Sequence, residues 1–169
     1  SYAGIVSGSG NLSKKGGGML TLAGTNSYSG PTSILAGTLA LSSTGMLGSG
    51  SLSIAPGASF DVSQTGGFTL SSGRLLSGAG TITGSLTVAA GARLETNAGA
   101  VAATFRTGNL AVSGEVRLRL GAAAAGDLVW ANGNLAINPG ATLSIVDGEA
   151  DGLGAIDAGT YTLLQTDGL

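Results

Sequence analysis

The sequence predicts an all-β protein: a right-handed parallel β-helix (β-solenoid) with a hairpin or sandwich-like cap at its C-terminal end. A Gly-x-apolar-x-apolar pattern recurs along the 169 residues, and such alternation places both apolar side chains on one face of a strand. Glycine is the commonest residue, at 32 against 3 prolines. This mixture favours tight turns between many short strands over helices, whose interiors glycine destabilises.

Seven segments match this pattern, and we expect each to form a short strand whose leading glycine supplies a turn. In chain order they are Gly18–Leu22, Gly37–Leu41, Gly50–Ile54, Gly66–Leu70, Gly84–Val88, Gly108–Val112 and Gly133–Ile137. Their leading glycines are 13 to 25 residues apart. That spacing is too irregular for a strict tandem array, but it lies near the length of one solenoid coil.

A longer match describes how the strands are joined. The segments Gly50–Val62, Gly84–Thr96 and Gly133–Ile145 share glycine at their first and eighth places, alanine at the ninth, and apolar residues at the third, fifth and eleventh. The turns "APGA", "AAGA" and "NPGA" therefore each separate two strands. Corners of a few residues, with apolar side chains of constant parity, are what a chain wound into a parallel solenoid requires.

An antiparallel sandwich is the rival fold, because strands every 8 to 12 residues also suit it. Dipeptides typical of tight hairpins appear only late, as Asn132-Gly133, Asp147-Gly148, Asp151-Gly152 and Asp167-Gly168. We therefore predict parallel coils over residues 1–127 and a C-terminal capping segment of the same domain over residues 128–169.

Composition excludes several classes of function. Charged residues make up 9% of the chain, with 7 basic against 9 acidic side chains, so no basic face for nucleic acid or an anionic membrane is expected. Cysteine and histidine are absent, which removes disulfides, thiolate or imidazole metal sites and Ser-His-Asp triads. Neither an apolar run long enough to span a membrane nor a signal peptide is recognisable. We expect any targeting segment to lie outside this chain.

The stretch Gly16–Ser43 resembles the passenger-associated repeat of Gram-negative autotransporters, roughly G-x-L-x-L-x-G-x-N-x-Y-[ST]-G-x-T-x(4)-G-T-L-x-[LV]. The matching positions are Gly18, Leu20, Leu22, Gly24, Asn26, Tyr28, Ser29, Gly30, Thr32, Gly37, Thr38, Leu39 and Leu41. We expect the two apolar runs of this stretch to be successive strands of one coil, with residues 23–33 as the corner between them. The segments 126–146 and 158–168 resemble the barrel-proximal end of such passengers, called the autochaperone or junction region.

This resemblance implies a non-catalytic C-terminal passenger segment that promotes outer-membrane translocation and seeds β-helix folding at the bacterial surface, from which it can be released. Its implied partners are its own C-terminal translocator barrel and upstream passenger coils, both outside this chain, and we expect a monomer. One alternative is an adhesin or self-association module that binds host or sister-cell surfaces. A more distant alternative is a β-solenoid enzyme acting on polysaccharides.

We predict no catalytic, cofactor-binding or metal-binding residues. Asp61 and Glu95 occupy equivalent places in two of the longer repeats, but we expect solvated side chains rather than a glycosidase pair. The acidic run 147–157 lacks known calcium-binding spacing, and we expect a solvated loop.

Other conspicuous side chains are expected to be structural. In Glu115–Leu120 the charged residues should face outward and guard a sheet edge. Lys14 and Lys15 should be solvated. Trp130 should pack on the end of the solenoid, and Tyr161 within the terminal strand. Tyr28 should cover a corner with its ring and form a hydrogen bond through its hydroxyl.

Overall fold

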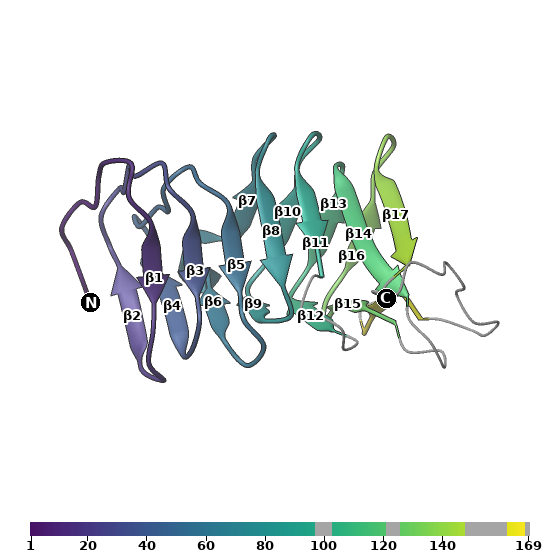
Figure 1. Ribbon diagram of the computed structural model, residues 1–169, viewed down its shortest axis with the longest axis horizontal. Helices are drawn as coiled ribbons and strands as arrows, with labels where there is room; N and C mark the ends of the chain where they lie inside the picture. The colour runs from purple at the N-terminus through teal and green to yellow at the C-terminus, as the bar shows by residue number, and fades with distance from the viewer. Residues whose placement is uncertain (97–102, 121–125, 148–161, 168–169) are drawn as a thin grey trace.

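The structure, a computed structural model, describes residues 1–96, 103–120, 126–147 and 162–167. Within these ranges the chain winds into coils of parallel strands that stack along one long axis (Figure 1). A 3-10 turn, η1 (Ser63–Thr65), is the one helical element described. No helix in these ranges is long and apolar enough to cross a membrane. The predicted all-β parallel solenoid is confirmed.

Three parallel sheets form the sides of the coils (Figure 1). Sheet 1 contains β1 (Leu12–Lys14), β3 (Thr32–Ile34), β5 (Leu52–Ile54), β8 (Leu75–Gly78), β11 (Arg93–Glu95), β14 (Glu115–Leu120) and β17 (Thr142–Asp147). Sheet 2 contains β2 (Met19–Leu22), β4 (Thr38–Leu41), β6 (Ser59–Asp61), β9 (Thr81–Thr83), β12 (Thr104–Thr107), β15 (Leu128–Ala131) and β18 (Leu164–Thr166). Sheet 3 contains β7 (Phe68–Leu70), β10 (Leu86–Val88), β13 (Leu110–Val112) and β16 (Leu135–Ile137).

The core consists of columns in which equivalent residues of successive coils lie one above another. In sheet 1, Leu52, Leu76, Leu94 and Val116 are direct register partners, and all four are buried. Alternation along each strand explains this arrangement, because the residues before and after each column residue point away from the core. Burial of one such side chain contributes about 1.5–3 kcal/mol. Repetition of these columns supplies the stability that no single short strand could provide.

Close stacking also explains two glycines of the repeats. Gly30 lies against the carbonyl of Gly10, and Gly50 lies against the carbonyl of Gly30. A Cβ at Gly30 or Gly50 would overlap the backbone of the preceding coil. These glycines are required by the closeness of neighbouring coils, and neither has a positive φ.

All seven predicted Gly-x-apolar-x-apolar segments contain a strand, but these strands are distributed over three sheets. The two runs of the passenger-like repeat, β2 and β4, are hydrogen-bonded neighbours in sheet 2, with Leu20 opposite Leu39. They are separated by a whole coil that includes β3, and not by a single corner. The expectation that residues 23–33 form one corner between successive strands is therefore wrong.

The three longer repeats each place a corner between two strands, as predicted. The copy beginning at Gly50 joins β5 to β6, from sheet 1 to sheet 2. The copies beginning at Gly84 and Gly133 join β10 to β11 and β16 to β17, from sheet 3 to sheet 1. Similar sequence thus forms two different corners, because both require the same turn between apolar strands.

The parallel pattern continues beyond residue 127. Strands β15, β16, β17 and β18 each pair in parallel with the strand of the preceding coil. Asn132-Gly133 joins β15 in sheet 2 to β16 in sheet 3, so the hairpin expected there is wrong and the pair forms a corner. The other three Asp-Gly pairs include glycines outside the described residues. The antiparallel contact described is an isolated bridge between Leu120 and Gly126.

Leu86→Asp is expected to abolish folding, because Leu86 is 1% exposed and a charge there would have no partner inside the coil. The adjacent Thr87→Asp variant is the control. Thr87 alternates with buried Leu86 and Val88, and its substitution should change the free energy of unfolding by about 0.5 kcal/mol or less. Far-ultraviolet circular dichroism measures the outcome, and a folded Leu86→Asp protein would contradict the assigned core.

Candidate functional site

A group of charged side chains lies on the outer face of sheet 1, across β11, β14 and β17. Register places Arg93 opposite Glu115 and Glu115 opposite Thr142. The next outward row places Glu95 opposite Arg117. Opposite charges therefore face each other across neighbouring strands, an arrangement that stabilises a sheet. We call Arg93, Glu95, Glu115, Arg117 and Ser144 the charged ladder.

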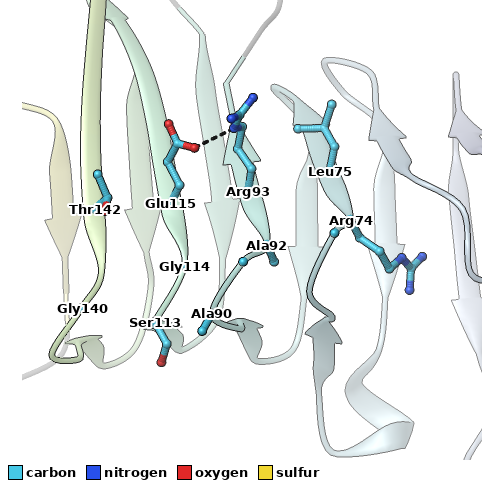
Figure 2. Close-up of a pocket in the computed structure, with 12 residues that line it drawn as sticks. Arg74, Leu75, Ala90, Ala92, Arg93, Ser113, Gly114, Glu115, Gly140 and Thr142 are labelled. Atoms are coloured by element: carbon cyan, nitrogen blue, oxygen red, sulfur yellow. Dashed lines mark hydrogen bonds and ion pairs between the residues drawn. The ribbon is translucent and has the colours of Figure 1, made fainter.

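Glu115 joins three strands within the charged ladder. Arg93 Nε donates a hydrogen bond of 2.7 Å to Glu115 Oε2, and Ser144 Oγ donates one of 2.6 Å to Oε1. Figure 2 shows Arg93 and Glu115 directed toward each other. These two bonds hold the pKa of Glu115 below its ordinary value, Ser144 having the larger effect. Both carboxylate oxygens are thus engaged in linking coils.

The second ion pair of the charged ladder is looser. Arg117 Nη1 and Glu95 Oε1 are 3.9 Å apart, with Arg117 more exposed than Glu95. Exposed pairs of this kind contribute about 0–1 kcal/mol. The charged ladder is therefore a set of modest links between coils, in which each of its two carboxylates is paired with an arginine cation.

A shallow groove of about 500 Å³ lies at the corner beside the charged ladder (Figure 2). Its floor consists mainly of small corner residues, including Gly73, Gly91, Gly114 and Gly140. Among the described residues that line it, Glu115 is the one carboxylate, and this group is already bonded to Arg93 and Ser144. The predicted absence of a glycosidase pair stays a prediction, since one carboxylate is found among the described residues of this groove.

Asp127 is a buried carboxylate that sequence reasoning missed. It is 2% exposed. Its Oδ2 accepts hydrogen bonds from Thr96 Oγ1 at 2.6 Å and from the Arg119 amide at 3.1 Å, while Oδ1 accepts one from the Ala103 amide at 2.9 Å. Arg119 Nε lies 3.8 Å from Oδ2. The available signal was a single acid within the apolar sequence "AAAAGDLVW".

The network around Asp127 connects separate parts of the chain. Thr96 follows β11, Ala103 precedes β12, and Arg119 belongs to β14. A buried carboxylate is costly unless it is hydrogen-bonded and paired, and Asp127 satisfies both conditions. Its role is therefore to hold these backbone segments together, a structural function.

The structure does not bring Asp61 and Glu95 together as a pair. Asp61 lies in β6 of sheet 2, whereas Glu95 lies in β11 of sheet 1. Asp61 accepts local hydrogen bonds from the Ser63 amide and hydroxyl. Their equivalent sequence positions fall in different sheets because the two longer repeats form different corners.

Residues Glu115–Leu120 have the predicted orientation. Val116, Leu118 and Leu120 are buried, and the charged residues alternate with them. The predicted role in guarding an edge is wrong, because β14 pairs with β11 on one side and β17 on the other. The charges there connect neighbouring strands.

The prediction of a solvated Lys14 is also wrong. Lys14 is 6% exposed and is the register partner of core residue Ile34. Its ammonium donates hydrogen bonds to the carbonyls of Lys15, Gly16 and Ala36. Its aliphatic stem can therefore occupy a core column while its charge is satisfied by backbone oxygens. Lys15 is exposed, as expected.

The aromatic residues have different outcomes. Tyr28 is 1% exposed, and its hydroxyl lies 2.6 Å from Thr32 Oγ1, which confirms the predicted hydroxyl hydrogen bond. Trp130 lies in β15 opposite Arg106 and Gln165, on an outer strand position and not on the end of the solenoid. Arg106 lies 4.3 Å from the Trp130 ring centroid, and Trp130 Nε1 donates to Asp167.

Two other predictions fall mainly on residues that the structure leaves out. Tyr161 lies outside the described residues, as does most of the acidic run 147–157. Among the residues that are described, no group of three or more acidic side chains could hold a metal ion. The described charged ladder links neighbouring coils.

Comparison with known proteins gives two matches. Residues 12–41 match the passenger-associated-transport-repeat family. The chain is 38% identical over 114 residues to the adhesin BmaC autotransporter of Brucella suis biovar 1, a match covering 63% of this chain and 3% of that protein. The chain thus spans only a small part of this relative. No solved structure matches.

The charged ladder should weaken in acid. The folded pKa of Glu115 is lowered from 4.5, so its stabilising contribution is fully present above that pH and is lost as pH falls through the folded pKa. Urea midpoints of the original protein and Glu115→Gln should therefore differ at pH 7 and converge in acid. Asp61→Asn is the control, and a difference independent of pH would contradict this role.

Proposed function

We propose that this chain, an autotransporter passenger repeat region, is a non-catalytic stalk segment that promotes outer-membrane translocation and seeds β-helix folding at the cell surface. The match at residues 12–41 and the similarity to BmaC support passenger-type export to the bacterial surface. Such a passenger implies a linked translocator domain. Release from the surface and contact with upstream coils are further parts of this proposal.

The distribution of charged links supports a seeding role. All three ion pairs in the described part of the chain fall between residues 93 and 127. The coils around β1 to β6 are joined instead by backbone pairing, apolar columns, Lys14 and neutral side chains such as Asn26. In a solenoid, stability is approximately a sum of coil stabilities and nearest-neighbour interfaces. The additional ion pairs in the C-terminal half would therefore make those coils the first to remain folded.

The uneven distribution of ion pairs along the chain would matter for the order in which the coils leave the cell. If the C-terminal part of a passenger reaches the outside first, stable coils there can present sheet edges to the coil that follows. Each newly stacked coil then buries apolar surface and retains the segment outside without nucleotide hydrolysis. In this proposal the autochaperone part of the domain is residues 128–169, whose strand β17 stacks directly on the ion-paired strand β14.

A second candidate function is adhesion, favoured by one observation. BmaC is described as an adhesin. On this chain an adhesive surface would lie on the outer faces of the sheets, with a host or bacterial surface molecule as its partner. The two functions are compatible, because a stalk can also carry a binding face.

Hydrogen exchange should reveal the proposed stability order. Strands β4 and β15 are each flanked on both sides in sheet 2, which makes them a fair comparison. In moderate urea, amides of β15 should exchange more slowly than those of β4, because the nearby ion pairs and Asp127 resist local opening. Mass spectrometry of peptic fragments measures both rates, and equal or reversed protection would contradict seeding from the C-terminal half.

Asp127→Asn tests the connection between stability and export. The variant loses a charge-assisted acceptor for the Ala103 and Arg119 amides. We expect its free energy of unfolding to fall by about 1–3 kcal/mol. Introduced into the full secreted protein, it should also reduce surface display measured by flow cytometry with an N-terminal epitope. Asp61→Asn is the matched control. Normal display despite a measured loss of stability would contradict the proposed function.

A further inference from the structure

Sheet 3 begins partway along the solenoid, at β7. In the described chain, β7 pairs with β10 on one side and no strand pairs with its other edge. The Phe68 amide donates to the Ser85 carbonyl, and the Ala89 amide donates to the Leu70 carbonyl, both across the β10 side. Because adjacent residues of a strand direct their backbone groups to opposite edges, the N–H and C=O of Thr69 point to the unpaired edge.

An apolar groove of about 340 Å³ lies beside this edge. Met46, Leu47, Phe68 and Thr69 are among the residues that line it. Met46 is 56% exposed, whereas Leu47 is nearly buried. An unpaired strand edge beside apolar side chains is the arrangement that binds extended peptides by strand addition, in which backbone hydrogen bonds supply affinity and side-chain pockets supply specificity.

Among the described residues that line this groove, Arg74 is the one with a charged side chain. Its guanidinium lies 5.6 Å from the Phe68 ring centroid and donates to the carbonyls of Gly48 and Gly50 through Nε and Nη2. These bonds hold the cation in a fixed place, and burial lowers its pKa. No carboxylate is found among the described residues that line the groove. The groove beside Arg93 differs, because Glu115 already neutralises that arginine.

We propose that the free edge of β7 and this groove form a docking site for an extended segment of another polypeptide, with an apolar side chain and a carboxylate. Its backbone pairs with the N–H and C=O of Thr69. Its apolar side chain lies between Met46 and Phe68, and its carboxylate is attracted to Arg74. Charge complementarity decides the chemistry of this partner, since an acidic segment finds one cation and no competing acid.

A fluorescein-labelled peptide with the sequence Thr-Leu-Ser-Ile-Val-Asp is a suitable probe, because it alternates apolar residues and ends in an acid. Fluorescence anisotropy with the 169-residue chain should show saturable binding. N-methylation of alternate amides should weaken binding by about tenfold or more by removing strand pairing, and so should replacement of aspartate by lysine. Equal binding of all three peptides would overturn the proposal.

Met46→Lys places a bulky cation on the groove and should reduce binding by about tenfold. Met19→Lys is the matched control, since Met19 is 66% exposed and lies outside the groove. In the unchanged protein, hydrogen exchange at the Thr69 amide should slow when the peptide binds. Loss of binding in both variants, or an unprotected Thr69 amide, would overturn the assignment.

Analytical ultracentrifugation of the protein without peptide distinguishes the occupant. We expect no association that depends on Met46. Dimerisation abolished by Met46→Lys but not by Met19→Lys would assign the edge to a second copy and overturn the commitment to another polypeptide. The stalk proposal is independent of all these results, because its tests depend on Asp127 and on the order of hydrogen exchange.

Discussion

The structure depends on one constraint: each coil must stack in register on the next, so that residues in paired strands lie opposite their counterparts in the neighbouring coil. This requirement produces the columns Leu52, Leu76 and Leu94 and excludes a Cβ at Gly30. It also dictates how polar groups enter. Asn26 accepts a hydrogen bond from the Val6 amide below and donates one to the Met46 carbonyl above. A polar residue is tolerated inside the stack where it serves both neighbours.

The same constraint explains how much of the fold could be predicted. Alternation identifies strands locally, so the solenoid class, the seven Gly-x-apolar-x-apolar strands and the strands after the turns of the longer repeats could be predicted from the sequence. It does not reveal which sheet a strand joins, because an inward face looks the same on every side of a coil. Strands β1 and β3 were missed because Lys14 and Thr32 occupy core columns as polar residues. Their relationship is a spacing of 20 residues, Leu12 to Thr32 to Leu52, visible only once the register is known.

The charged groups were less predictable because their roles depend on neighbours distant in sequence. Nothing near Glu115 in the sequence indicates its role, which depends on hydrogen bonds from Arg93 and Ser144 in the neighbouring coils. Asp127 is likewise defined by Thr96, Ala103 and Arg119, which approach it only through stacking. Orientation could be predicted for Glu115–Leu120, since it is a local property. The partners of these charged side chains could not be predicted. The sequence therefore did not show that they lie on a central strand, with β11 on one side and β17 on the other.

The start of sheet 3 shows how a regular stack can acquire a distinctive place. Before β7, the third side of each coil is built from irregular segments, in which Asn26 and Tyr28 satisfy or cover the backbone. From β7 onward that side is a pleated sheet, with Phe68 in register with Leu86. An irregular segment cannot provide the ladder that the first strand requires, so the change of cross-section leaves one edge of β7 unpaired. Arg74 lies at this junction and links the two kinds of coil through Gly48 and Gly50. Uniform stacking of coils produces a regular rod with the same surface along its length. The start of sheet 3 at β7 interrupts this regularity and so creates a distinct surface.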